Sequence, residues 1–110
     1  MSTRDNGNPE PAEPLLTARP RSVLELIVNN HPGVMSHVVG LFSRRAYNVE
    51  GILCMPIGDA ARSRIWLLVG EDERLEQMVK QLNKLEDVLT VARHGADHRV
   101  FVQLEEFFKG

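Results

Sequence analysis

The order of its apolar segments restricts the fold of this chain more than any other feature. Four short runs of aliphatic and β-branched residues have the length of strands, and two longer stretches carry apolar residues at the spacing of an amphipathic helix. Only a few residues separate the second run from the third, which is typical of a β-hairpin. The predicted strands are 23–28, 48–55, 63–69 and 88–92, and the predicted helices are 34–46 and 71–85.

This order of elements, β-α-β-β-α-β, predicts an α+β domain with ferredoxin-like topology. Because crossover connections are right-handed, the strands form one four-stranded antiparallel sheet with both helices on one face. The first strand then lies in the centre of the sheet, and the second lies at an edge. The opposite face and the edge strand stay open to another protein or to a second copy of this chain. We therefore expect the chain to oligomerise.

Three regions follow from the distribution of prolines and apolar residues. Residues 1–21 hold four of the six prolines, so we expect a disordered N-terminal tail. The predicted domain spans 22–94, and residues 95–110 form a C-terminal amphipathic segment. This segment fits a short helix better than a strand, and it either packs on its own sheet or binds a partner. Its apolar residues are Val100, Phe101, Leu104, Phe107 and Phe108.

Composition excludes several classes of protein. The 13 Lys and Arg residues are outnumbered by 15 Asp and Glu, so a basic face for nucleic acid is not expected. No apolar run reaches the roughly 18 residues that span a bilayer, and the N-terminus has no apolar signal segment. The single cysteine, Cys54, forms neither an internal disulfide nor a cysteine zinc site. We expect a soluble, cytoplasmic protein without membrane contact.

Residue patterns typical of catalysis are scarce. His94 and His98 have the spacing of metal ligands on a helix, but Gly95 lies between them and no third ligand is near. Cys54 has apolar neighbours on a predicted strand, where a cysteine behaves as a small hydrophobic residue rather than a nucleophile. We therefore predict no catalytic residue and no metal site.

The most informative stretch is the loop 29–35 between the first predicted strand and the first predicted helix. Pro32 presets the backbone angle of a helix start, and Gly33 lets a ligand approach the backbone closely. The first N–H groups of that helix lack an intrahelical acceptor and favour a carboxylate. Asn30 and Asn48 offer amide oxygens to an ammonium and amide N–H groups to a carboxylate. The set suits a free α-amino acid. The alternative is that Asn30 only caps the helix and Gly33 only turns the chain, and the local chemistry leaves both open.

This loop is the first part of a longer segment that resembles a known protein family. Residues 29–38, continuing through 40–53, resemble the regulatory (small) subunit of acetolactate synthase, also called acetohydroxyacid synthase. The resemblance resumes in 63–69, 75–78 and 84–88, so that it covers roughly Val23 to Arg93. It implies an ACT domain, whose element order agrees with the one predicted above.

The resemblance further implies a homodimer, in which two ACT domains pair through their edge strands into one continuous sheet. A branched-chain amino acid, typically valine, would bind at the interface between them. The family's effector contacts lie in the loop after the first strand and near the start of the second strand. In this chain the matching positions are Asn30, Gly33, Val34, Met35 and Asn48.

A catalytic partner is also implied by the resemblance. The family's small subunit binds a large subunit that carries thiamine diphosphate, Mg²⁺ and FAD, raises its activity and confers feedback inhibition on it. No cofactor is expected on this chain. Many members have a second C-terminal domain, whereas this chain ends at Gly110 and resembles the short, single-domain form. Its C-terminal segment is therefore a candidate for docking on the catalytic subunit.

Three alternative functions remain. An ACT-type amino-acid sensor for a different biosynthetic enzyme would use the same loop. An acylphosphatase-like enzyme would need a phosphate-binding loop with an arginine after the first strand, where this chain has His31 and Pro32. RNA recognition by the sheet would need several exposed aromatic residues on central strands, and only Trp66 qualifies.

Overall fold

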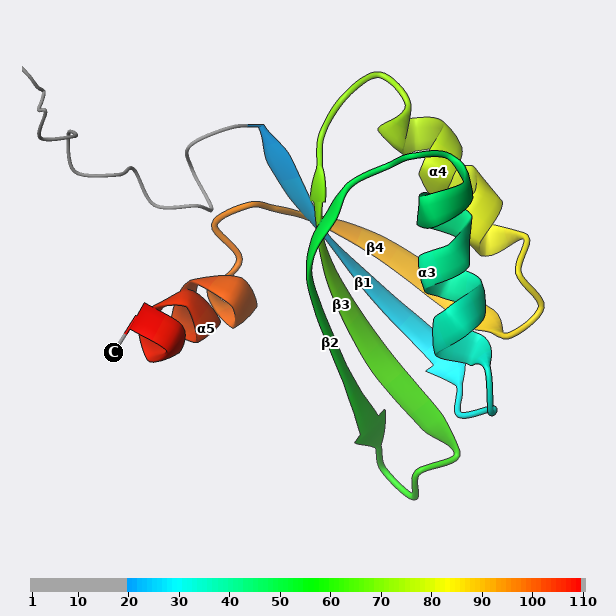
Figure 1. Ribbon diagram of the computed structural model, residues 1–110. Coiled ribbons are helices and arrows are strands. Elements are labelled where there is room, and N and C mark those ends of the chain that lie inside the picture. Colours follow the sequence, from blue (N-terminus) through cyan, green and yellow to red (C-terminus); the bar gives the residue numbers. More distant parts are fainter. Residues whose placement is uncertain (1–19, 110) are drawn as a thin grey trace, which may run out of the picture.

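The computed structural model of the protein describes residues 20–109, and within this range it has the predicted order of strands and helices (Figure 1). The strands form one antiparallel sheet in the order β2-β3-β1-β4, which confirms that the first strand is central and the second lies at an edge. The elements are β1 (Arg21–Asn29), α3 (Val34–Arg44), β2 (Val49–Ile57), β3 (Arg62–Gly70), α4 (Leu75–Asn83), β4 (Val88–Gly95) and α5 (Arg99–Lys109).

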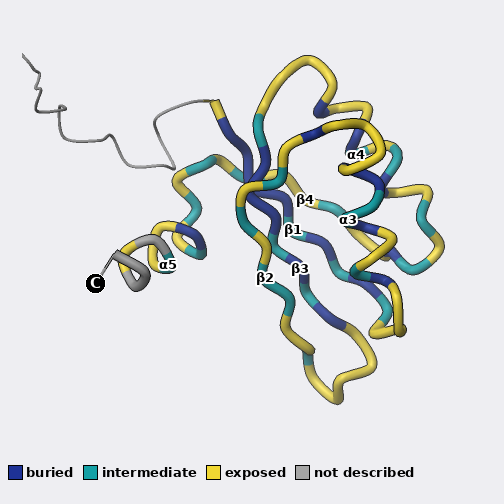
Figure 2. The backbone as a smooth tube through the Cα atoms, viewed as in Figure 1, coloured by how far each residue is buried: buried dark blue, intermediate teal, exposed yellow. Residues whose placement is uncertain are grey.

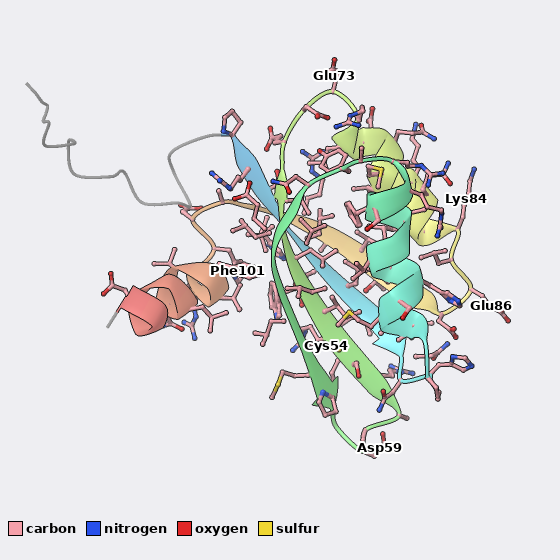
Figure 3. The ribbon with its side chains drawn as sticks, in the orientation of Figure 1. Cys54, Asp59, Glu73, Lys84, Glu86 and Phe101 are labelled. Carbon is pink, nitrogen blue, oxygen red and sulfur yellow. The ribbon has the colours of Figure 1, made fainter. Side chains whose placement is uncertain are left out.

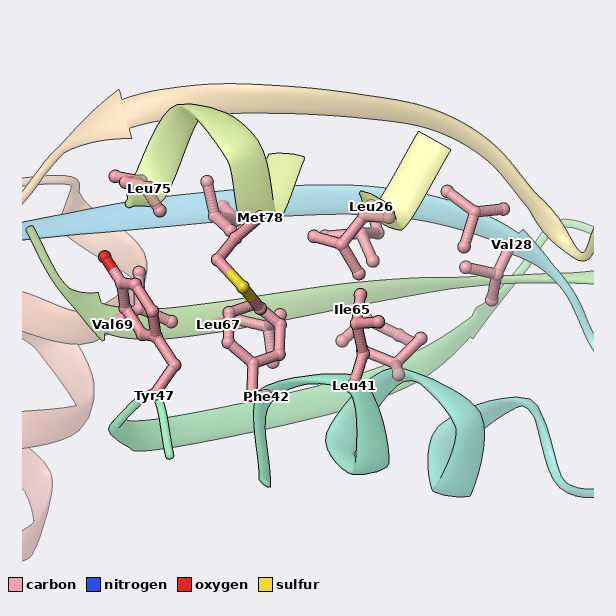
Figure 4. Close-up of a cluster of buried hydrophobic side chains, with 14 of the residues drawn as sticks. Leu26, Val28, Leu41, Phe42, Tyr47, Ile65, Leu67, Val69, Leu75 and Met78 are labelled. Carbon is pink, nitrogen blue, oxygen red and sulfur yellow. The ribbon is translucent and has the colours of Figure 1, made fainter. Parts of the chain in front are cut away.

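Helices α3 and α4 cover one face of the sheet, as predicted (Figure 1). Alternate residues of β1 and β3 point toward these helices, because successive side chains of a strand face opposite sides. They meet the apolar stripes of both helices in a single core, which Figure 4 shows in close-up. The buried residues of the two helices are Val34, Val38, Leu41, Phe42, Leu75, Met78 and Leu82. Figure 2 shows that the central strands β1 and β3 contain many buried residues, whereas β2 is mostly exposed or only partly buried.

Several predicted boundaries differ from those in the structure. β2 runs through Pro56, which was predicted to close it; an edge strand tolerates proline because one of its sides is unpaired. β4 extends past Ala92 because its end pairs with the start of β1. α4 begins at Leu75 rather than at Glu71, since the backbone carbonyl of Asp72 accepts the Leu75 N–H at 3.1 Å in a turn before the helix.

The start of β1 also differs from the prediction. Arg21 was assigned to the tail, but it is the first residue of β1 and is buried against Glu50. The rest of the predicted tail, apart from Pro20, lies outside the described residues.

Helix α5 packs on the face of the sheet opposite α3 and α4 (Figure 1). Its Phe101 points at the sheet, where it is buried with Val23 and Leu68 (Figure 3). Trp66 and Leu104 are partly buried around this second, smaller cluster. The C-terminal segment was expected either to pack on its own sheet or to bind a partner, and in the structure it packs on its own sheet. The side chains of Phe107 and Phe108 lie outside the described residues.

Gly51 is the residue on which Phe101 rests. The pairing of β2 with β3 shifts register between Val49 and Gly51, and a Cβ at Gly51 would lie 2.9 Å from Cε1 of Phe101. Gly51→Ala is therefore expected to push α5 off the sheet, and trypsin should cleave after Arg99 faster than in the unsubstituted chain. The matched control is Gly70→Ala, because a Cβ there meets no atom within 4 Å. Equal cleavage rates in the two variants would contradict this packing.

Candidate functional site

The connection between β1 and α3 forms an open loop at one end of the sheet. Gly33 precedes the helix in a left-handed conformation, with φ 91° and ψ −8°, a region that glycine adopts without strain. A Cβ at Gly33 would meet no atom within 4 Å, so the backbone here is open to a ligand. The loop is closed upon itself by two backbone bonds, from His31 N–H to the Asn29 carbonyl and from Val34 N–H to the His31 carbonyl.

These backbone bonds decide which N–H groups remain for a carboxylate. The predicted donors included Val34, but its N–H donates to His31 at 3.1 Å and its side chain is buried. The first intrahelical bond runs from His37 N–H to the Gly33 carbonyl at 3.0 Å. Between them, the N–H groups of Met35 and Ser36 meet no acceptor among residues 20–109. Ser36 was missed by the sequence prediction, although its place in the first helical turn was the available signal.

Asn30 ties this loop to the turn between β2 and β3. Its Nδ2 donates to the Ala60 carbonyl at 2.7 Å, and its backbone N–H donates to the Ala61 carbonyl at 3.0 Å. A carbonyl only accepts, so the amide nitrogen must face Ala60. The exposed Oδ1 is then the atom that Asn30 offers to a ligand, and it suits an ammonium rather than a carboxylate.

A hollow of about 280 Å³ lies at the same end of the sheet, beside the bonds that Asn30 makes. Asp59 marks this turn at the tip of the hairpin in Figure 3. The hollow is lined by Ile57, Gly58, Asp59, Ala61 and Arg62.

Asn48 lies far from this loop within one chain. It directly precedes Val49, which pairs with Val69, whereas Asn29 pairs with Arg62 at the other end of β3. At about 3.3 Å per residue along a strand, this pairing separates Asn48 from the loop by more than ~20 Å. The structure therefore brings together four of the five predicted site residues, Asn30, Gly33, Val34 and Met35, and leaves Asn48 at the opposite end of the sheet.

The segment that carries Asn48 is firmly held between α3 and β2. Tyr47 donates its hydroxyl to the Gly70 carbonyl at 2.6 Å and packs edge-on against Phe42. The Arg74 guanidinium lies 4.7 Å over the Tyr47 ring and donates to the Arg45 carbonyl at 3.1 Å. Burial, followed by the nearby negative charge of Asp72, raises the pKa of Tyr47, so its phenol stays protonated and keeps the bond to Gly70.

Asp72 holds Arg74 in this position. The hydrogen bond from the Arg74 side chain is the main reason that the pKa of Asp72 is lowered. A lowered pKa in the folded state stabilises the fold above the ordinary carboxyl range, and this contribution is lost as the pH falls through the lowered pKa. The free energy of unfolding of Asp72→Asn should therefore be below that of the unsubstituted chain near pH 7, and the difference should shrink in acid. Glu86→Gln removes an exposed loop carboxylate outside this cluster and is the matched control for the loss of one carboxylate.

His94 and His98, the two histidines with the spacing of metal ligands, have structural partners. His94 contacts Glu25 at 2.9 Å, and His98 accepts the Val100 N–H at 3.2 Å. The two imidazole rings and Trp66 lie against one another between the sheet and the start of α5, with their planes tilted by 39–53°. Among residues 20–109, no three His, Cys, Asp or Glu side chains gather as a metal site. Within the same range, no helix has the length and apolar character required to cross a membrane.

Comparison with known proteins gives the class of this domain. The sequence model of the family described as "AHAS small subunit-like ACT domain" matches residues 24–90. An ACT domain of GTP pyrophosphokinase from Chlorobium tepidum shares the fold, with a TM-score of 0.56 at 17% identity, over 68% of this chain and 97% of that one. The βαββαβ sheet with an open loop after its first strand is thus an ACT domain.

The relatives narrow the class to one family. The chain is 57% identical over 93 residues to the acetolactate synthase isozyme 1 small subunit of Escherichia coli K12, covering 84% of this chain and 97% of that protein. It is 43% identical over 76 residues to the isozyme 3 small subunit of the same organism, covering 68% of this chain and 47% of that protein. The solved acetolactate synthase small subunit of Thermotoga maritima superposes with a TM-score of 0.61 at 28% identity, over 82% of this chain and 68% of that one. The chain belongs to the acetolactate synthase small-subunit family.

Proposed function

We propose that this chain is the non-catalytic regulatory subunit of an acetolactate synthase, which activates the catalytic subunit and makes it sensitive to feedback inhibition by valine. The similarity to the isozyme 1 small subunit, over nearly the whole length of that protein, is the observation that carries the proposal. The open loop at Gly33 supports it, because free N–H groups and an amide oxygen lie where a zwitterion would find both of its partners.

The effector site is completed by a second copy of the chain. β2 is an edge strand whose outer side is unpaired, and Met55 on it is 57% exposed. If two β2 strands pair antiparallel across a twofold axis, the start of one strand comes beside the end of the other. The partner's Asn48 then lies near the Asn30 loop. Pairing through β4, the other edge, would leave the partner's Asn48 far from this loop.

In the proposed complex each end of valine has its own partners. The carboxylate accepts hydrogen bonds from the N–H groups of Met35 and Ser36, and the ammonium donates to the amide oxygens of Asn30 and the partner's Asn48. The isopropyl group enters an apolar pocket between the two protomers. Since such a pocket distinguishes one methylene by about 1–3 kcal/mol, leucine and isoleucine should bind less tightly rather than not at all.

Valine regulates the enzyme because the site spans two protomers. Binding changes how they pack, and this packing must differ between the active and the inhibited holoenzyme for inhibition to follow. Coupling of this kind is typically about 1–3 kcal/mol. The catalytic subunit, in the cytoplasm, supplies thiamine diphosphate, Mg²⁺ and FAD, and this chain holds none of them. The outer side of α5, where Val102 is 37% exposed, is the candidate contact with that subunit.

Two measurements test the proposal. Calorimetry on the full chain should give heat on addition of valine, and the chain should co-purify with a thiamine-dependent acetolactate synthase whose activity it raises. Absence of both results would refute it. Heat with valine together with capture of a different biosynthetic enzyme would instead support the alternative, an ACT-type sensor for that enzyme.

A further inference from the structure

A buried arginine lies behind the segment that carries Asn48. The side chain of Arg21 has no exposed surface, yet it carries a full positive charge. Its Nε donates to Oε1 of Glu50 at 2.9 Å, and its Nη2 donates to the same oxygen. Its Nη1 meets no acceptor within the part of the chain that the structure describes. The Glu50 carboxylate is therefore the group that compensates this buried charge.

Glu50 reaches Arg21 because of an irregularity in the sheet. β2 pairs with β3 at Val49 and again at Gly51, and the register of the two strands shifts between these residues, at Glu50. A bulge of this kind turns a side chain away from the ordinary alternation of the strand. Here the carboxylate lies between the first residue of β1 and the residue just before β2.

The second carboxylate oxygen orients Asn48. Oε2 of Glu50 accepts a hydrogen bond from Nδ2 of Asn48 at 3.1 Å. An ionised carboxylate only accepts, so the amide nitrogen of Asn48 must face Glu50 and the amide oxygen must face away. Among residues 20–109, no donor meets that oxygen.

We infer that Arg21 and Glu50 are positioning residues for effector binding: together they orient the Asn48 amide so that it offers an oxygen to the effector's ammonium and no N–H to its carboxylate. The inference rests on the proposed function, in which Asn48 contacts valine. This orientation explains how the neutral amide of Asn48, which could bind either the carboxylate or the ammonium of a zwitterion, binds the ammonium. Asn30 is oriented in the same sense by the Ala60 carbonyl, so both amides present acceptors.

Exchanging the acid and the amide tests this orientation. Glu50→Gln keeps an oxygen for Arg21 but turns an N–H toward Asn48, which must then flip and present its own N–H to the ammonium. Asn48→Asp alone sets two carboxylates side by side. In Asn48→Asp/Glu50→Gln, the introduced aspartate accepts the glutamine N–H and again presents an oxygen, at the original net charge.

Each single variant is expected to lose affinity for valine, and the double variant is expected to regain it. Glu50→Gln should bind valine at least about tenfold more weakly than the unsubstituted chain, because a hydrogen bond to a charged group is lost. Asn48→Asp should also bind valine more weakly, because the two adjacent carboxylates repel each other and turn the side chain at position 48 away from its place. The double variant should return to within about threefold of it, since the lost contact is restored. Calorimetry on the full chain gives the affinities, and thermal unfolding reports whether each variant is folded. Glu76→Gln, an exposed carboxylate on α4, is the matched control and should bind valine normally.

Four outcomes would overturn the inference. In the first, Glu50→Gln is folded and binds valine like the unsubstituted chain. In the second, the double variant binds as weakly as the singles. If Glu50→Gln fails to fold, the double variant is compared with Asn48→Ala, and equal weakness of the two overturns the inference. No heat from the unsubstituted chain would overturn the proposed function as well, whereas the other outcomes leave it standing.

Discussion

Gly33→Asp is expected to abolish inhibition by valine while the small subunit still assembles with its catalytic partner. Two effects act together at this position. Gly33 has φ 91°, and a residue with a Cβ is strained by roughly 1–2 kcal/mol in the left-handed region. In addition, the introduced carboxylate lies beside the N–H groups that would receive the carboxylate of valine, so the two like charges repel each other. The measurement is the valine dependence of acetolactate formation by the reconstituted holoenzyme.

Two further substitutions separate strain from charge at Gly33. Asparagine has nearly the shape of aspartate, adopts the left-handed region about as readily as aspartate does and carries no charge, so Gly33→Asn should retain partial inhibition. Gly33→Ala adds strain without charge or hydrogen-bonding capacity. Full inhibition of the Gly33→Asp holoenzyme by valine would show that the effector does not bind at this helix start.

Phe42→Ala is expected to cause the largest loss of stability. Phe42 is 1% exposed, belongs to the main core and packs edge-on against Tyr47 with ring centroids 5.7 Å apart. Truncating a buried phenylalanine to alanine costs about 3–5 kcal/mol, because apolar contacts are lost and a cavity remains. Native domains have only about 5–15 kcal/mol of stability in total, so this single substitution should remove a large part of it. Urea unfolding of the full chain measures the loss.

Val102→Ala is the control for this truncation. Val102 is exposed on α5, and surface substitutions usually change stability by less than about 0.5 kcal/mol. A loss below about 1 kcal/mol in Phe42→Ala would mean that the core does not pack as described.

Much of the fold was predictable from the sequence because its signals are local. The apolar spacing of α3, the turn formers after β1 and the short loop between β2 and β3 act within a few residues of one another. Two of the boundaries that failed depend on the place of the strand in the sheet. Pro56 stays in a strand because that strand is at an edge, and β4 continues to Gly95 because β1 begins at Arg21.

The candidate site was predictable only in part for the same reason. Pro32 and Gly33 mark the helix start in the sequence itself. The Val34 N–H donates to the His31 carbonyl and is therefore not free for a ligand. No pattern in the sequence predicts this hydrogen bond. Likewise, Arg21 and Glu50 are 29 residues apart and meet only through a bulge between two paired strands.

The cluster of rings beneath α5 contains an intrinsic fluorophore. Trp66 is the single tryptophan of the chain, and its indole lies against His94 and His98 where α5 begins. Emission from that indole therefore reports on one place only, the seam between the sheet and the C-terminal helix. A fluorescence titration would follow that seam directly while valine or the catalytic subunit is added, without any attached dye.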